Sequence, residues 1–180
     1  MQIRNLQVDF FCTKLPSLFI FNLKKMERTF VMVKPDAIQR GLIGEIFHRF
    51  ERKGLKLVAC KMGSLEEEVL KKHYAHIADK PFFPGISKFM QSSPVILTAW
   101  EGLECVTAVR EIVGITKARE AEAGSIRGDF AMSIQCNVVH ASDTPENAEK
   151  ELALHFKKGD FHSYSKTEYE HIYSTDEYEK

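Results

Sequence analysis

The stretch Asn137-Val-Val-His-Ala-Ser-Asp143 follows and overlaps a short apolar run, Met132 to Val139, which we predict to be the last strand of a sheet. His140 then stands at the strand end, where its side chain points away from the core. An imidazole in such a place can act as a nucleophile, a general base or a metal ligand. A histidine at a strand end is also commonly an ordinary surface residue, so the neighbouring sequence has to decide between these interpretations.

A helix is expected directly after this stretch, with Thr144 as its N-cap and Pro145 at its first position. Every fourth residue from Ala148 is apolar, and Glu151 borders that stripe, so its carboxylate can face inward towards His140. A carboxylate that holds one ring nitrogen leaves the other nitrogen free to attack. The alternative interpretation is a solvated carboxylate within a run of charged residues.

The composition limits the class of protein. A chain of 180 residues suggests one domain that can bury a core without staples. Its 25 Lys and Arg balance 25 Asp and Glu, so no global field favours nucleic acid or a membrane surface, and no apolar run is long enough to span a bilayer. The cysteines form no C-x-x-C pair, and we interpret them as reduced, mostly buried thiols of a cytoplasmic protein. They are Cys12, Cys60, Cys105 and Cys136.

Residues 1–25 differ from the rest of the chain, because they are rich in aromatic and basic side chains. Asp9 and Pro16 interrupt them and no small-residue cleavage site follows, so they make a poor secretory signal. Met26 resembles an alternative start. We therefore interpret residues 1–25 as an N-terminal extension outside the fold and residues 26–180 as the folded domain. Its Tyr-, Glu- and Lys-rich tail, from about residue 163, is expected to pack loosely over a neighbouring surface.

Strands and helices alternate along the domain. We predict earlier strands over 29–34, 55–62 and 94–100, and helices over 42–53, 64–77, 86–91 and 103–113, the second of them opened by a capping box. Residues 115–131 show no convincing period. Helices between strands imply crossovers. The order therefore predicts an α+β fold of the ferredoxin type, a sandwich in which a four-stranded antiparallel sheet carries helices on its face or faces.

Several polar side chains fall at element ends or in the long loop, where they could meet a ligand. They are the cations Lys34, Arg110 and Arg127 and the neutral hydrogen-bonding residues Tyr74, Thr116 and Asn137. Arginine forks match phosphate oxygens, and lysine serves as a point charge. Neither a Walker A motif nor G-x-G-x-x-G occurs, so a nucleotide site would have to be built from side chains. Taken singly, each of these residues is equally consistent with an ordinary charged or polar side chain on the surface.

The segment Lys80-Pro-Phe-Phe-Pro-Gly85 places two aromatic residues between prolines, which argues against regular structure there. Paired phenylalanines on a rigid surface turn form either a lid over the core or a platform for a flat ligand. The sequence leaves both interpretations open.

Seven blocks of sequence occur in a characteristic order. They are V-K-P-D (33–36), Q-R-G-L-I-G-E-I (39–46), H-Y (73–74), P-F-F-P-G (81–85), W-E-G (100–102), I-R-G-D-F (126–130) and N-V-V-H-A-S-D (137–143). With them the chain closely resembles the nucleoside diphosphate kinase family, from residue 26 to about residue 160. The N-x-x-H-x-S-D signature with its upstream I-R-G-D-F block is highly specific.

The resemblance implies a ferredoxin-like fold and a ping-pong phosphoryl transfer, in which His140 takes the γ-phosphate of ATP or another nucleoside triphosphate and passes it to a diphosphate. It implies that Glu151 orients His140 and that Lys34 and Tyr74 belong to the catalytic set. The residues around the phosphates would be Lys34, Tyr74, Arg110, Thr116 and Arg127. Asn137, with Lys34, would bind the sugar hydroxyls, and Phe82 would stack on the base.

The same resemblance implies the cofactor and the partners. Mg²⁺ would ride on the nucleotide phosphates and would take no ligand set from the protein. The partners would be nucleoside di- and triphosphates, with no nucleic acid and no membrane, and the chain would form a homo-oligomer, a hexamer rather than a tetramer. The enzyme would maintain the pools of nucleoside and deoxynucleoside triphosphates.

Three departures from the family pattern stand out. Ala141 follows the histidine where the family commonly has glycine, Lys117-Ala118 follows the loop threonine where relatives often have Asn-Pro, and the tail matches only loosely. Two other functions compete with the kinase. One is a non-catalytic nucleotide-binding domain of the same fold. The other is a metal-binding protein that uses His73 and His76, which share a helical face but have no evident third ligand nearby.

Overall fold

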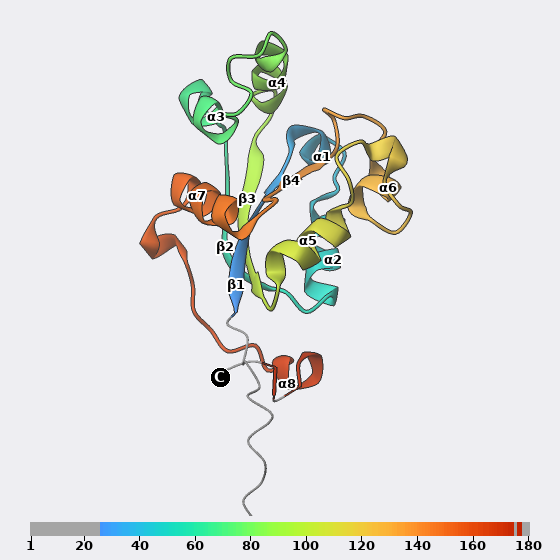
Figure 1. The fold of residues 1–180 in the computed structure, drawn as a ribbon, viewed down its shortest axis with the longest axis vertical. Coiled ribbons are helices and arrows are strands. Elements are labelled where there is room, and N and C mark those ends of the chain that lie inside the picture. Colours follow the sequence, from blue (N-terminus) through green and yellow to red (C-terminus); the bar gives the residue numbers. More distant parts are fainter. Residues whose placement is uncertain (1–25, 175, 178–180) are drawn as a thin grey trace, which may run out of the picture.

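A four-stranded sheet lies at the centre of the computed structural model, which describes residues 26–174 and 176–177 (Figure 1). The strands are Glu27–Val33 (β1), Lys56–Gly63 (β2), Val95–Gly102 (β3) and Val139–Ala141 (β4). Their order is β2-β3-β1-β4, and every neighbouring pair is antiparallel. The predicted α+β fold of the ferredoxin type is confirmed.

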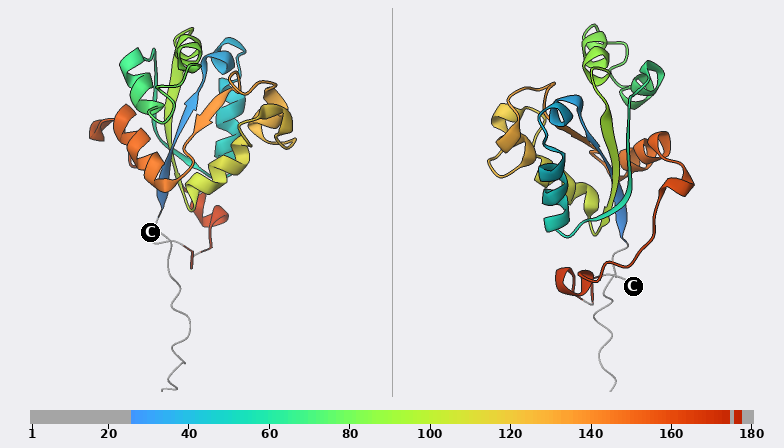
Figure 2. Two further views of the ribbon diagram at one scale, coloured as in Figure 1. Left: turned by 45° about the horizontal axis from the view of Figure 1, so that its top comes forward. Right: turned by 180° about the vertical axis from the view of Figure 1, so that it is seen from behind.

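Helices cover both faces of this sheet (Figures 1 and 2). They are Pro35–Gln39 (α1), Ile43–Arg52 (α2), Glu67–His73 (α3), Phe83–Met90 (α4), Cys105–Val113 (α5), Ala118–Glu120 (η1), Ile126–Phe130 (α6), Pro145–His155 (α7), Lys158–Asp160 (η2) and Tyr169–Ile172 (α8). Helices α2 and α5 lie on one side of the sheet, and α3 and α7 lie together on the other.

Strand β1 belongs to two hydrophobic cores because its side chains alternate between the faces. Val31 and Val33 pack into the core under α2 and α5, while Phe30 and Met32 pack into the core under α3 and α7. All four side chains are fully buried. A strand buried on both faces reads as a continuous apolar run, and full burial of each such side chain contributes about 1.5–3 kcal/mol.

The last strand differs from its prediction. Residues 132–138 of the run do not pair as a strand, and β4 is limited to Val139–Ala141, so His140 lies within the strand and not after it. Val138 has φ = 62°, which an extended ladder does not allow. The strand predicted from this apolar run is therefore wrong for residues 132–138.

Three helical segments also differ from their predictions. The capping box predicted at Ser64–Glu67 is wrong, since α3 begins at Glu67 without a side-chain cap and ends at His73, short of residue 77. The proline-flanked segment is partly helical, because Pro84 falls in the first turn of α4, where a missing N–H costs little. The loop 115–131 contains η1 and α6, and Ser125 Oγ caps α6 by accepting from the Gly128 N–H.

The tail packs on its own chain and not loosely. Tyr164 donates its hydroxyl to the Leu57 carbonyl at 2.9 Å, and Lys166 Nζ donates to the Leu55 carbonyl at 3.2 Å. These contacts hold residues 164–166 beside the start of β2.

Of the described cysteines, Cys105 is buried, whereas Cys60 and Cys136 are exposed, so the expectation of mostly buried thiols is wrong. The predictions for Cys12 and for residues 1–25 fall outside the described residues. Within the described part of the chain, every helix is too short or too polar to cross a bilayer.

Candidate active site

One cavity of about 1090 Å³ brings all of the predicted site residues together. Its lining includes Lys34, Tyr74, Phe82, Arg110, Thr116, Arg127, Asn137, His140 and Glu151. These side chains come from strand ends, helices and loops that lie far apart in the sequence. The fold therefore assembles one candidate site from all the site residues that the sequence predicted.

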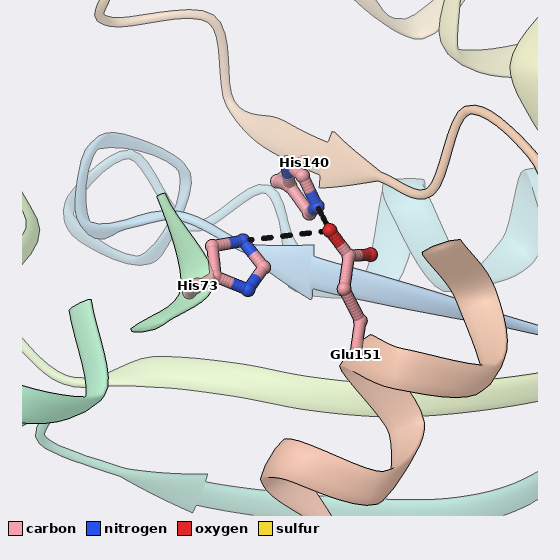
Figure 3. A group of neighbouring side chains, drawn as sticks. All are labelled: His73, His140 and Glu151. Atoms are coloured by element: carbon pink, nitrogen blue, oxygen red, sulfur yellow. Dashed lines mark hydrogen bonds and ion pairs between the residues drawn. The ribbon is translucent and has the colours of Figure 1, made fainter. Parts of the chain in front are cut away.

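At the centre of the site, Glu151 of α7 faces His140 of β4. Glu151 Oε1 lies 2.9 Å from His140 Nε2, as Figure 3 shows. A carboxylate can only accept, so the shared proton sits on Nε2 and the lone pair of Nδ1 is left available. Ser142 Oγ donates to the other carboxylate oxygen at 2.5 Å. The carboxylate is thus held from two directions, and it orients the imidazole.

A strained backbone residue sets the position of His140. Val138, two residues earlier, has φ = 62°, a conformation that is unusual for a β-branched residue and costs about 1–3 kcal/mol. Its N–H donates to Asp36 Oδ2 at 3.0 Å, and its carbonyl accepts from the Lys34 N–H at 2.9 Å. Both partners belong to the V-K-P-D block, so this block anchors the segment that carries the histidine.

The ammonium of Lys34 is buried among hydrogen-bond acceptors. Lys34 Nζ donates to Asn137 Oδ1 at 2.6 Å and to the Gln135 carbonyl at 3.3 Å. Burial, together with the nearby charge of Arg127, lowers the pKa of Lys34 from 10.5 to about 8. Asn137 Nδ2 in turn donates to the Thr116 carbonyl at 3.0 Å. This network holds Lys34 and Asn137 against each other in the cavity wall.

Arg127 on α6 is fixed by the backbone. Its two terminal nitrogens donate to the carbonyls of Gly114, at 2.7 Å, and Val139, at 2.8 Å. Burial and the charge of Arg110 lower the pKa of Arg127 to about 10. The next residue must be glycine, because a Cβ at Gly128 would lie 2.0 Å from the Glu122 carbonyl oxygen. The I-R-G-D-F block therefore reflects a tight turn that presents a guanidinium.

The remaining predicted residues differ in their exposure. Phe82 precedes α4 and is 57% exposed at the cavity, whereas its neighbour Phe83 is buried in the core. Tyr74, which follows the last residue of α3, is buried. Burial and the charge of Glu151 raise the pKa of the Tyr74 hydroxyl, so it remains a hydrogen-bond donor at neutral pH.

Sequence reasoning did not place two histidines beside the nucleophile candidate. His73 of α3 was considered as a metal ligand together with His76, and His155 of α7 was not considered. His155 Nε2 lies 3.2 Å from His73 Nδ1, and the ring of His155 stacks on Phe30 at 4.7 Å. Burial lowers the pKa of His73 strongly and that of His155 to about 4. The signal available in the sequence was that both histidines lie in helical segments, α3 and α7, which the fold then packs beside His140.

The arrangement suits the transfer of an anionic group. Lys34, Arg110 and Arg127 are predicted cations of the lining, and Arg119 and Lys150 line it as well. Positive side chains around an oriented imidazole can hold phosphate oxygens while the imidazole attacks. An exposed aromatic ring at the cavity offers a surface on which a flat group can stack.

Comparison with known proteins points the same way. The family model described as nucleoside diphosphate kinase matches residues 27–161. The chain is 53% identical over 141 residues to a nucleoside diphosphate kinase of Methanoculleus marisnigri, covering 78% of this chain and 95% of that protein. It is 45% identical over 151 residues to nucleoside diphosphate kinase B of Rattus norvegicus, covering 84% and 99% of the two chains.

The fold comparison includes a halophilic nucleoside diphosphate kinase from Halobacterium salinarum, whose structure was solved in complex with CDP. The TM-score is 0.80 at 43% identity, and the match covers 82% of this chain and 99% of that one.

Proposed function

The chain belongs to the nucleoside diphosphate kinase family and is a phosphotransferase that acts on nucleotides; from this premise, we propose that it transfers the γ-phosphate of ATP to nucleoside diphosphates through a phosphohistidine at His140. The observation that carries the proposal is the bond between Glu151 Oε1 and His140 Nε2. It leaves Nδ1 as the nitrogen with a free lone pair, in a cavity lined by cations.

The reaction takes place in two half-reactions. In the first, the Nδ1 lone pair of His140 attacks the γ-phosphorus, and a P–N bond forms as the bond to the β,γ-bridging oxygen breaks and the diphosphate leaves. Glu151 stabilises the positive charge that develops on the ring. In the second, a terminal β-phosphate oxygen of the acceptor diphosphate attacks the same phosphorus, the P–N bond breaks, and the ring returns to its neutral form. Repeated cycles would maintain the pools of nucleoside and deoxynucleoside triphosphates.

Charge and position are the main requirements of this chemistry, because phosphoryl transfer passes through a loose transition state. We assign the phosphate oxygens to Lys34, Arg110 and Arg127, with Thr116 and Tyr74 as neutral donors. Two of these groups are held rigidly: Arg127 by two backbone carbonyls and Lys34 by Asn137. Such preorganised donors need little rearrangement when the phosphate arrives.

The nucleoside is assigned to Asn137 and Phe82. Asn137, with Lys34, would bind the sugar hydroxyls, and the exposed ring of Phe82 would stack on the base. Stacking is tolerant of base identity because every base has a π-face. This mode of recognition supports an enzyme that accepts all common nucleotides.

Mg²⁺ is proposed as the cofactor, bound to the nucleotide phosphates. Magnesium prefers six oxygen ligands and usually binds through few carboxylates. In the cavity, both oxygens of Glu151 are already engaged, and Asp143 Oδ1 accepts from Asn147 at 2.7 Å. The donor set therefore fits a metal that arrives with the nucleotide, where it neutralises charge on the phosphates.

We also propose a homo-oligomer, a hexamer rather than a tetramer. Large apolar side chains that are exposed on the single chain support it, namely Met62 on the edge strand β2 and Ile115 and Met132 near the loop. Light scattering coupled to gel filtration gives the mass directly, and a monomer would refute the assembly.

Two further assignments are proposals about the whole chain. Residues 1–25 are an extension of the kinase domain 26–180, in agreement with a family match that begins at residue 27. The free thiols of Cys60, Cys105 and Cys136 fit a cytoplasmic location. Imaging of the tagged full-length protein in its source cells tests that location, and an exclusively extracellular or organellar signal would contradict it.

The experiment for the proposed function is a labelling chase. The protein is incubated with γ-labelled ATP and Mg²⁺, and acid-labile phosphate is expected on His140, as the isomer substituted at Nδ1. GDP or dCDP should then remove the label as the triphosphate. His140→Ala should retain less than roughly a thousandth of the steady-state transfer, since a covalent nucleophile contributes several kcal/mol. His48→Ala, on the exposed surface of α2, is the matched control. Persistent label on His140→Ala would refute the assignment.

A further inference from the structure

His73, His140 and Glu151 form a cluster in which His73, a residue without a role in the proposed phosphoryl transfer, joins two residues of that site. One potential ligand atom from each residue lies within 4.8 Å of the others. Glu151 Oε1 is 2.9 Å from His140 Nε2 and 3.9 Å from His73 Nε2, so both imidazoles point at one carboxylate oxygen (Figure 3). We propose that this cluster is an inhibitory binding site for a divalent transition metal of the Zn²⁺ type.

The first support is a polar atom without a partner. The side chain of His73 is fully buried, and its Nε2 makes no hydrogen bond with any of the described residues. Such groups are rare, because a buried polar atom without a partner loses its hydrogen bonds to water and gains none in return. The atom is directed at Glu151, in the position that a metal ligand would take.

The second support is the partner of the other ring nitrogen. His73 Nδ1 lies 3.2 Å from Nε2 of His155, which is itself held flat against Phe30 with an interplanar angle of 7°. When His73 donates its Nδ1–H to His155, its Nε2 carries the lone pair that binds a metal. Metal-binding histidines nearly always have a hydrogen bond of this kind at the second nitrogen. His155 would therefore set the tautomer that makes His73 a ligand.

The ligand set decides the kind of metal. Two imidazoles and one carboxylate are typical of Zn²⁺, with a fourth position left open, whereas Mg²⁺ prefers oxygen ligands. Zn²⁺ with bonds of about 2.0–2.2 Å holds its ligands roughly 3.4 Å apart. The distances of 2.9 and 3.9 Å to Glu151 lie on either side of that value, and the ligand atoms of the two histidines lie within 4.8 Å of each other, so side-chain rotations would bring the three ligands to a metal.

Binding would oppose phosphorylation. The metal takes the Nε2 lone pair of His140 in place of the bond to Glu151, so the ring proton moves from Nε2 to Nδ1, and Nδ1 loses the lone pair that would attack phosphorus. It also removes the carboxylate that stabilises the charged ring. This inhibitory effect rests on the proposed role of His140, but the metal site itself does not.

The test uses Zn²⁺ and Co²⁺ without nucleotide, on the full chain. Calorimetric titration with Zn²⁺ should show one site per chain, and Co²⁺ should give the visible bands of nitrogen and oxygen ligation. His73→Phe should abolish both signals. His155→Phe, which keeps the stacked ring, should weaken binding about 10- to 100-fold, as expected for loss of a supporting hydrogen bond. His48→Gln should bind like the wild type, and excess Mg²⁺ should not compete.

Circular dichroism and thermal unfolding check that each variant folds, and His73→Gln replaces His73→Phe if the latter does not. Absence of Zn²⁺ binding by the wild type, equal binding by the His73 variant, or the charge-transfer bands of cysteine ligation would overturn the proposal. In a separate arm, Zn²⁺ should slow labelling of His140, and a zinc-selective chelator should restore it. Metal binding without any labelling of His140 would instead refute the proposed function and leave the metal site standing.

Discussion

Ser142 holds Glu151 by a hydrogen bond of 2.5 Å from its Oγ to Oε2 of the carboxylate. Ser142 follows β4 directly, two residues after His140, so the strand that carries the imidazole also holds the group that orients it. The carboxylate cannot rotate away from His140 Nε2 without breaking this second bond. Ser142 is therefore a positioning residue, which acts on the histidine through Glu151.

We predict that Ser142→Ala lowers kcat on the order of tenfold, because a hydrogen bond to a charged group contributes about 1.5–3 kcal/mol. KM should stay nearly constant, since Ser142 is not among the residues that line the cavity. Steady-state kinetics separate the two parameters. Ser64→Ala, at an exposed position that does not line the cavity, serves as control. An increase in KM with constant kcat would contradict a positioning role.

Phe82→Ala should weaken binding of all four common nucleotides by similar factors, since stacking contributes about 1–3 kcal/mol per base and tolerates any base. Phe82 is 57% exposed, so its loss should leave the thermal midpoint unchanged. Calorimetric titration with each nucleoside diphosphate measures the effect, and Phe82→Trp should preserve binding. A large loss for one base alone would show that Phe82 reads base identity.

Lys34 predicts a pH dependence of stability. Its pKa is about 8 in the folded chain, below the ordinary 10.5, so the unfolded state binds more protons between these values. The contribution of Lys34 to the free energy of unfolding must therefore rise as the pH increases from about 8 to 10.5, by about 3 kcal/mol at most. Urea unfolding of the wild type and of Lys34→Met across this range should give a difference that grows with pH. A constant difference would contradict the shifted pKa.

Ala118→Pro should stabilise the chain by about 0.4–1 kcal/mol, since proline reduces the entropy of the unfolded state. Ala118 opens η1, where a proline is well tolerated. We expect a higher thermal midpoint, an oligomer that resists dissociation on dilution, and nearly unchanged kcat. Ala121→Pro is the matched control, because the Ala121 N–H donates to the Ala118 carbonyl and its loss should destabilise. A lower midpoint for Ala118→Pro would mean that the loop does not accept the ring.

A chain shortened to begin at Met26 should be fully active and more soluble than the full chain. Residues 1–25 are rich in aromatic and basic side chains and precede the family match. Activity, solubility and oligomeric mass of the two chains are compared directly. Loss of activity or a changed mass would make the segment part of the working protein.

The site residues could be predicted from the sequence because they lie in motifs that occur in a characteristic order along the chain. These motifs contain the side chains that phosphoryl transfer requires. Motif spacing and the alternation of elements were sufficient for the family and for the antiparallel sheet. Local patterns were less reliable where tertiary contacts override them. The run 132–139 looks like a strand, but the bond from the Val138 N–H to Asp36 holds its end in a left-handed conformation. The proline-flanked aromatics resemble a turn, yet Pro84 is compatible with the start of a helix.

Sequence alone therefore predicted which histidine, which cations and which aromatic ring belong to the candidate site, and the cavity contains all of them. Only the tertiary structure decided which groups meet around that histidine. His73 and His155 lie on helices separated by two strands in the sequence, and they meet because α3 and α7 pack on the same face of the sheet. Contacts of this kind depend on packing between distant elements, and no spacing along the chain records them.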